Sequence, residues 1–134
     1  MVTRRQWLAG LGAGGVAVVV ATGSGAMAFE GAAYDAKTFA QAQAEGRPIL
    51  IEVHAGWCPV CWKQGPLLTT LLKQPEFARV LRITVEFDME KDVLKVFGVT
   101  RQSTLIVFKG AQETGRSIGE VDPARLEALL RSAL

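Results

Sequence analysis

The sequence predicts a single α/β domain built as a three-layer sandwich, and three features indicate it. Predicted helices and strands alternate along the chain from residue 35 onward. The strand predicted at Ile49 to His54 is apolar almost throughout, which is typical of a central strand covered on both faces. Directly after that strand lie the only two cysteines of the 134-residue chain, three positions apart. The pair therefore follows a central strand, at the start of the next predicted helix.

The first half of the domain contains two predicted helices on either side of this strand. Asp35 to Ala44 is predicted to be a short helix with Phe39 facing inward, and a Glu-Gly-Arg-Pro break separates it from the strand. The second helix is predicted from Pro59 to about Lys73. Proline is accepted in its first turn because the missing amide would have no helical partner there. Pro66 lies inside this helix and is expected to kink it.

The second half continues the alternation with four segments, predicted as a strand at Leu81 to Phe87, a helix at Lys91 to Phe97, a strand at Leu105 to Lys109 and a strand at Thr114 to Glu120. The last two strands are expected to form a hairpin through a turn at Gly110. Asp122 is predicted to cap a final helix that has Pro123 at its first position. The apolar stripe of that helix is formed by Leu126, Leu129, Leu130 and Ala133. Nothing in the sequence indicates a second domain.

The first 28 residues have the pattern of an export signal. Arg4 and Arg5 precede a stretch without charged residues from Gln6 to Phe29, and an A-x-A cleavage motif occupies residues 26–28. The paired arginines and the glycine-rich, moderately apolar core resemble a twin-arginine signal. We therefore expect cleavage after Ala28, a mature domain at residues 29–134 and a periplasmic location.

Two alternatives to a twin-arginine signal remain open for the first 28 residues. One is a plain Sec signal, and the other is an uncleaved anchor, because the uncharged stretch exceeds the roughly 20 residues that span a bilayer. Six glycines and a tail of small residues favour removal. Without Arg4 and Arg5, 13 of the 15 basic side chains remain against 13 acidic ones, so the mature domain is near neutral. This balance indicates no binding to nucleic acid or anionic lipid, and we expect a soluble monomer.

The cysteine pair itself predicts redox chemistry. It lies in Trp57-Cys58-Pro59-Val60-Cys61. At the first turn of a helix the backbone amides point toward the leading sulfur, and the helix dipole favours its thiolate. Cys58 is therefore the predicted nucleophile. Cys61 lies one turn further along and is predicted to attack a mixed disulfide formed at Cys58, which releases the product.

Structural roles for the pair are disfavoured by spacing and composition. A bridge between Cys58 and Cys61 closes a minimal loop and removes little entropy from the unfolded chain. A closed zinc site usually needs four ligands, whereas the chain offers these two cysteines and one histidine, His54. The residue after Cys61 is Trp62, so the attachment motif of c-type haem is also missing.

From Ala33 to Leu134 the chain resembles the thioredoxin-like family. The resemblance rests on the cysteine motif, on Pro66 five residues after the second cysteine, on Phe97-Gly98-Val99, and on the segment from Thr104 to Gly110. It implies a central mixed β-sheet of about four strands flanked by helices, with Cys58 at the surface and Cys61 partly buried. It also implies thiol-disulfide exchange with protein clients and no cofactor besides the Cys58–Cys61 disulfide. Because export would place the pair in an oxidising compartment, a membrane or periplasmic electron donor is also expected to maintain it.

Ser103 departs from the family pattern, because the alignment places it where the family has a cis-proline opposite the cysteines. A cis bond before a non-proline residue costs about 2.5–4 kcal/mol, so the peptide from Gln102 to Ser103 is predicted to be trans. The altered loop affects how a client chain docks. The Ser103 hydroxyl is a candidate hydrogen-bond donor to Cys58, and an ordinary turn serine is the alternative. The expected client-binding residues are Trp57, Pro59, Val60, Ser103 and Thr104.

Glu52 is the third candidate catalytic residue. A carboxylate within the apolar strand is costly to bury without a partner or a purpose. The family has an acid at this position, beneath the second cysteine. Burial would raise its pKa and enable it to accept a proton from Cys61. The alternative is a structural pair at the rim of the domain with Lys63 or another cation.

Two further features bear on the reaction. The dipeptide Pro59-Val60 adds no charge that would stabilise the Cys58 thiolate, which favours a reducing couple and a role in reducing protein disulfides. The alternative function is a metal-binding or metal-delivery module, in which Cys58, Cys61 and His54 bind a soft ion such as copper(I). A lone histidine at a strand end is more often a packed or half-exposed residue.

Overall fold

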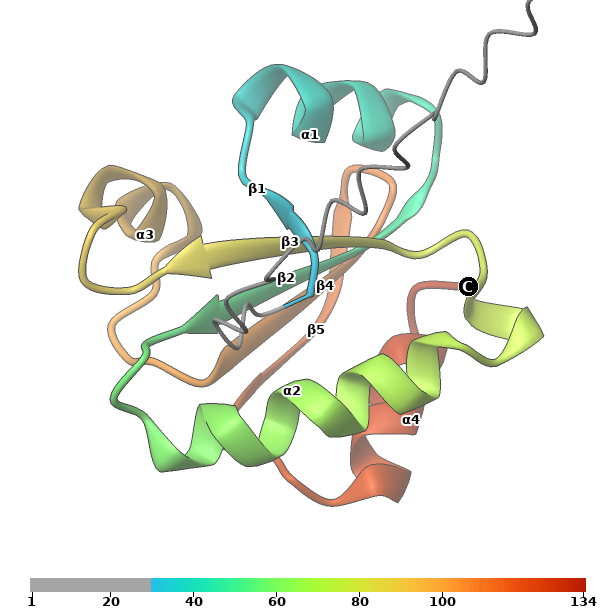
Figure 1. The fold of residues 1–134 in the computed structure, drawn as a ribbon. Helices are drawn as coiled ribbons and strands as arrows, with labels where there is room; N and C mark the ends of the chain where they lie inside the picture. Colours follow the sequence, from blue (N-terminus) through green and yellow to red (C-terminus); the bar gives the residue numbers. More distant parts are fainter. Residues whose placement is uncertain (1–29) are drawn as a thin grey trace, which may run out of the picture.

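A computed structural model describes residues 30–134 (Figure 1). The predicted export signal and its cleavage site lie outside the described residues. The fold is therefore that of the predicted mature domain. Among the residues described, no helix is both long and apolar enough to cross a membrane.

The described chain alternates helices and strands, as the sequence predicts. The elements in order are β1 (Ala32–Ala33), α1 (Ala36–Ala44), β2 (Pro48–His54), α2 (Pro59–Leu72), a 3₁₀ turn η1 (Pro75–Phe77), β3 (Leu81–Glu86), α3 (Lys91–Phe97), β4 (Thr104–Lys109), β5 (Gln112–Ile118) and α4 (Pro123–Arg131). Most boundaries lie within one or two residues of the predicted ones. The predicted cap at Asp122 is present, because Asp122 accepts hydrogen bonds from two amides of α4. Asp35, predicted as the first residue of its helix, is instead the N-cap of α1 and accepts a hydrogen bond from the Thr38 amide.

The strands form one mixed sheet in the order β1-β3-β2-β4-β5. β1, β3 and β2 run parallel, whereas β4 is antiparallel to β2 and β5 is antiparallel to β4. This confirms the predicted mixed sheet with helices on both faces. The short edge strand β1, which pairs with β3, is the one strand here that the sequence analysis did not predict.

Two separate cores hold the helices against the sheet. α1 and α3 cover one face and α2 and α4 the other (Figure 1). Successive side chains of a strand point to opposite faces, so Ile49 and Ile51 pack in the first core and Leu50 in the second. Glu52 shares the parity of Leu50 and therefore lies on the face that α2 covers.

The direction of the strands determines where the functional residues meet. β2 ends at His54, and the chain then reaches the cysteines at the start of α2. β4 begins at Thr104 and runs antiparallel to β2, so its first residue pairs with Val53 near the end of β2. The segment just before β4 consequently lies at the same edge of the sheet as the cysteine motif.

Candidate active site

Cys58 occupies the N-cap position of α2, and its sulfur serves as the cap. Its backbone is extended, with φ −89° and ψ 109°, and its Sγ accepts a hydrogen bond from the Cys61 amide at 3.2 Å. Pro59 follows in the first helical turn, as predicted. The sequence therefore folds so that an amide and the positive end of the helix dipole face the leading sulfur. Both cysteines are free thiols.

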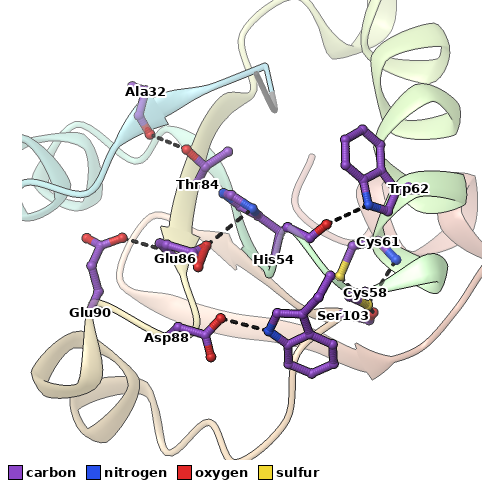
Figure 2. Close-up of polar contacts among 12 residues, drawn as sticks. Ala32, His54, Cys58, Cys61, Trp62, Thr84, Glu86, Asp88, Glu90 and Ser103 are labelled. Atoms are coloured by element: carbon purple, nitrogen blue, oxygen red, sulfur yellow. Dashed lines mark hydrogen bonds and ion pairs between the residues drawn. The ribbon is translucent and has the colours of Figure 1, made fainter. Parts of the chain in front are cut away.

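Ser103 contacts both cysteine sulfurs. Its Oγ lies 3.0 Å from the Sγ of Cys58 and 3.1 Å from the Sγ of Cys61, and Figure 2 shows the three side chains together. The contact with Cys58 is the one considered from the sequence. The contact with Cys61 was not foreseen, because the sequence alone does not show that one loop position is equidistant from both cysteines.

The backbone around Ser103 explains how its side chain reaches the sulfurs. No peptide bond in the described chain is cis, so the predicted trans bond before Ser103 is confirmed. Ser103 instead has a φ of 59°, a left-handed conformation that is uncommon for residues other than glycine. Its amide donates to the Val53 carbonyl and its carbonyl accepts from the Gly119 amide, both at 2.9 Å. These two hydrogen bonds fix the residue between β2 and β5.

The expectation of a surface-exposed Cys58 is wrong for this structure. Cys58 and Cys61 are each only 1% exposed. They pack with Ala55 and the partly buried Phe87, and the Ser103 hydroxyl contacts both sulfurs. A client disulfide therefore reaches Cys58 only after a local shift of these neighbours.

The two thiols are electrostatically distinct. Burial opposes ionisation of Cys58, but hydrogen bonds from the Cys61 and Ser103 side chains and from the Cys61 and Val60 amides outweigh it and lower the pKa of the Cys58 thiol. Burial raises the pKa of the Cys61 thiol, and its hydrogen bond to Cys58 raises it further. Cys58 is therefore the more acidic thiol of the pair, and Cys61 holds its proton more tightly.

Glu52 is buried, as the functional interpretation required, but its partner is a residue that the sequence analysis missed. The carboxylate is 1% exposed and pairs with Arg82 of β3, with 2.7 Å between Arg82 Nε and Glu52 Oε2. The structural alternative is therefore right that the partner is a cation, but the cation is Arg82 rather than Lys63, and the pair is buried rather than at the rim. Within residues 30–134 no hydrogen bond joins Glu52 to Cys61, and Glu52 Oε1 has no hydrogen-bond partner.

Arg82 also ties β3 to the helix that carries the cysteines. Its guanidinium donates to Thr69 Oγ1 at 2.8 Å and to the Gly65 carbonyl at 3.3 Å, both in α2. Arg82 could have been suspected from the sequence. A carboxylate buried in one strand needs an opposite charge nearby, and Arg82 is a cation in the strand predicted at Leu81 to Phe87. Lys63 on the helix was the one cation that the sequence singled out by name.

The exposed residues around the pair are mainly apolar. Trp57 is 58% exposed, and its indole N–H donates to Asp88 Oδ2 at 2.8 Å. Val60 and Trp62 are also exposed, and the Trp62 indole donates to the Gly56 carbonyl at 2.8 Å (Figure 2). Since both indoles make internal hydrogen bonds, their rings are held in place beside the motif.

The three remaining candidate residues differ in exposure and in their contacts. Pro59 is exposed next to Val60, as a client-binding residue should be. Thr104 is 1% exposed and donates to the Arg101 carbonyl, so its side chain is not available to a client at the surface. His54 lies 3.6 Å from a carboxylate oxygen of Glu86 on β3.

The metal-binding alternative finds no support in the described part of the chain. In residues 30–134 no group of three or more His, Cys, Asp or Glu side chains is arranged to hold a metal ion. The shared hydroxyl of Ser103 instead points to thiol chemistry at the two sulfurs.

Comparison with known proteins identifies the family. The family model named Thioredoxin matches residues 31–132. The chain belongs to the thioredoxin family. It is 32% identical over 92 residues to a thioredoxin of Chlamydia muridarum, covering 69% of this chain and 87% of that protein. It is 29% identical over 99 residues to thioredoxin Asp f 29 of Aspergillus fumigatus, covering 73% of this chain and 89% of that protein.

Solved thioredoxin structures are also similar in fold. The crystal structure of Trxlp from Edwardsiella tarda EIB202 superimposes with a TM-score of 0.72 at 44% identity, covering 75% of this chain and 98% of that one. Thioredoxin-family membership and the free cysteine pair together make this chain a thiol-disulfide oxidoreductase that acts on protein thiols and disulfides.

Proposed function

We propose that this thioredoxin-family protein is a periplasmic reductase of protein disulfides, in which Cys58 attacks and Cys61 resolves. The observation that carries the proposal is the asymmetry of the pair. The Cys58 thiol has a lowered pKa and accepts an amide hydrogen bond, whereas the Cys61 thiol has a raised pKa and is equally buried. A reductase needs one thiolate ready to attack and a second thiol held in reserve.

The first step is attack of the Cys58 thiolate on one sulfur of the client disulfide. A bond forms between Cys58 Sγ and that sulfur, the client disulfide breaks, and the second client sulfur leaves as a thiolate. In the second step Cys61 loses its proton and its sulfur attacks Cys58 Sγ. The Cys58–Cys61 disulfide forms and the other client thiol is released, so two electrons pass from the protein to the client.

The groups that stabilise Cys58 favour the reducing direction. Its hydrogen-bond donors are backbone amides and neutral side chains, and the side chains of Pro59-Val60 supply no charge. Neutral donors stabilise a thiolate less than a cationic side chain does. The reduced form is therefore stabilised less than in a strong oxidant, which gives a lower reduction potential.

A redox titration tests the direction. Residues 30–134 would be equilibrated in graded glutathione or dithiothreitol buffers, and the oxidised fraction of the pair would be measured by alkylation and mass spectrometry. A reductase should give a potential near the thioredoxin value of about −270 mV, whereas about −120 mV would indicate an oxidant. The Cys61→Ser variant is the control, because it should trap a mixed disulfide and fail to complete the cycle.

The proposed clients dock on the exposed apolar residues beside the motif. Trp57, Pro59 and Val60 surround the cysteines, and Trp62 adds a second exposed ring next to them. Binding of an extended client segment there would displace the neighbours that cover Cys58. We infer that the Cys58–Cys61 pair alone carries the electrons, without a bound cofactor, and that the mature protein acts as a soluble monomer.

Export is proposed from the first 28 residues, with their paired arginines and A-x-A motif. In an oxidising compartment a reductase must be recharged, so the proposal includes a membrane or periplasmic electron donor. N-terminal sequencing of the protein from a periplasmic fraction tests export, and a mature chain that begins at Phe29 is the expected result. An Arg4→Lys, Arg5→Lys variant that is still exported would favour a Sec signal over a twin-arginine signal.

A further inference from the structure

Ser103 contacts both cysteine sulfurs. A residue that only lowered the pKa of the Cys58 thiol would need to contact Cys58 alone. Its Oγ is almost equidistant from the two sulfurs, at 3.0 Å from Cys58 and 3.1 Å from Cys61. All three side chains are buried, with exposed fractions of 3% for the serine and 1% for each cysteine. Because the backbone of Ser103 is hydrogen-bonded on both sides, this position is fixed.

A hydroxyl has a single proton, so it donates to only one of the two sulfurs at a time. With Cys58 ionised and Cys61 protonated, the stable arrangement has the Ser103 O–H directed to the Cys58 thiolate. A hydrogen bond to a charged acceptor is about twice as strong as a neutral one. Once Cys58 is bonded to a client sulfur it carries no charge, so the Ser103 O–H is no longer held to the Cys58 sulfur by a charged acceptor.

We propose that the Ser103 hydroxyl serves the two cysteines in turn, donating to the Cys58 thiolate before attack and to the Cys61 sulfur during resolution. Between the two steps the hydroxyl hydrogen of Ser103 rotates from one sulfur to the other. In the second step the Cys61 S–H bond breaks, and its proton goes to the client thiolate released in the first step or to water. The Cys61 sulfur then attacks Cys58 Sγ, and the remaining client sulfur leaves. The inference rests on the proposed function and makes Ser103 a catalytic residue for both steps.

The position of Glu52 supports this assignment. A direct role for Glu52 would require contact with Cys61, but within the described chain its hydrogen bond goes to Arg82. The nearby carboxylates and His54 have other partners: His54 faces Glu86, Asp88 accepts from the Trp57 indole, and Glu90 accepts from the Glu86 amide. Of the polar side chains described here, the Ser103 hydroxyl is the one that hydrogen-bonds to both sulfurs.

Reaction with Ellman's disulfide separates the two steps in one experiment. Attack by Cys58 releases the first thionitrobenzoate, and resolution by Cys61 releases the second, so absorbance of the product gives two phases. Each phase would be followed across pH for wild type, Ser103→Ala and Ser103→Gly in the domain at residues 30–134. The glycine variant tolerates the positive φ without strain, so that a folded variant without the hydroxyl is available.

Removing the hydroxyl should slow both phases by roughly tenfold or more near neutral pH, as expected for a lost hydrogen bond to a charged group. The pH midpoint of each phase should rise, and the rates should approach those of wild type once both thiols ionise. A purely structural role would instead slow the phases by a factor independent of pH. Ser117→Ala is the matched control, since Ser117 Oγ has no hydrogen-bond partner in the described chain and its loss should leave both phases unchanged.

The remaining outcomes would overturn the inference. A change in the first phase alone would show that the Ser103 hydroxyl assists attack by Cys58 but not resolution by Cys61. Unchanged rates of both phases in both variants would show that the hydroxyl has no role in the reaction, and the proposed function would still stand. If wild type releases no second thionitrobenzoate, Cys61 does not resolve, and the proposed function fails together with this inference.

Discussion

Cys58 and Cys61 are one helical turn apart and equally buried, yet the pKa of one thiol is lowered and that of the other is raised. Burial alone raises the pKa of both thiols. The difference comes from hydrogen bonds, because the Cys58 sulfur accepts from the Cys61 amide, whereas the Cys61 thiol pairs with Cys58. The helix N-terminus thus makes Cys58 the more acidic of the two thiols.

Titration of the reduced domain should show this asymmetry. We expect thiolate absorbance to rise in two steps, one below and one above the pH at which an ordinary cysteine ionises, because the two pKa values shift in opposite directions. Attack by the first thiolate therefore gains rate as pH rises through the lowered pKa of Cys58 and then levels off. In Cys58→Ser the remaining step should move to lower pH, since the hydrogen bond and charge of Cys58 raise the pKa of Cys61. An unshifted Cys61 step in this variant would contradict the assignment.

The buried pair of Glu52 and Arg82 is predicted to contribute strongly to stability. Arg82→Met leaves the Glu52 carboxylate buried without its cation and removes two contacts to α2. We expect the free energy of unfolding in urea to fall by about 3–5 kcal/mol.

Two comparisons make this test specific to the buried pair. Arg131→Met, which breaks two exposed ion pairs, should cost about 1 kcal/mol or less. The double change of Glu52→Leu with Arg82→Met should recover much of the loss, because no buried charge remains. Equal losses in the single and double variants would show that the pair itself is not the cause.

At the scale of elements, α2 has two functions that use different parts of it. Its first turn presents the cysteines, and its middle receives Arg82 from β3 and packs Leu68 and Leu71 into the second core. α4 packs beside it on the same face and contributes Leu126 and Leu130 to that core (Figure 1). The position of the active site thus depends partly on α4, a helix that contains none of its reactive groups.

The cap of α4 provides a prediction at this scale. Asp122 accepts hydrogen bonds from the Ala124 amide at 2.8 Å and the Arg125 amide at 3.2 Å. Asp122→Ala removes both and should lower the free energy of unfolding by about 1 kcal/mol, measured by urea denaturation. Asp122→Asn keeps an acceptor and should retain most of the stability. If asparagine cost as much as alanine, the contribution would come from charge rather than from capping.

At the scale of the whole molecule, the sheet joins residues that are far apart in sequence. Ser103 and Cys58 are 45 positions apart, and they meet because β4 starts at the edge where β2 ends. Gly119, after β5, holds the Ser103 carbonyl from the other side. Three segments therefore build the site, and only the assembled sheet brings them together.

Global stability should depend on the redox state of the pair. In a reductase the folded protein favours the disulfide more than an unfolded chain does, so by thermodynamic linkage the oxidised domain is the more stable form. We expect the oxidised domain to melt at a higher temperature than the reduced domain in calorimetry. The Cys58→Ser, Cys61→Ser double variant cannot form the disulfide, so its melting temperature should be the same in oxidising and reducing buffer. A more stable reduced form would identify an oxidant.

The sequence predicts the elements and the reactive pair well because both depend on local patterns. The apolar run of β2, the cap at Asp122 and the cysteine spacing are each recognised within a few residues of sequence. The export signal lies outside the described residues and stays a prediction. The kink expected at Pro66 also stays a prediction.

The parts that sequence reasoning missed depend on contacts across the sheet. The partner of Glu52 comes from β3, and choosing Arg82 over Lys63 requires the strand order and the face of each side chain. The burial of Cys58 and the second contact of Ser103 likewise arise from packing between distant segments. Motif spacing contains no information about these distances.

The use of Cys58 Sγ as the cap of α2 links turnover to the integrity of the helix. Whenever Cys58 bonds to a client sulfur, the amide of Cys61 loses its charged acceptor, and the first turn of α2 is weakened at the moment when Cys61 must move. Reduction of the Cys58–Cys61 disulfide returns Cys58 Sγ to its role as the cap and stabilises the first turn of α2 again. Amide hydrogen exchange at Cys61 should therefore be slow in the reduced protein and faster in the mixed disulfide, so that local fraying of one helix turn accompanies each catalytic cycle.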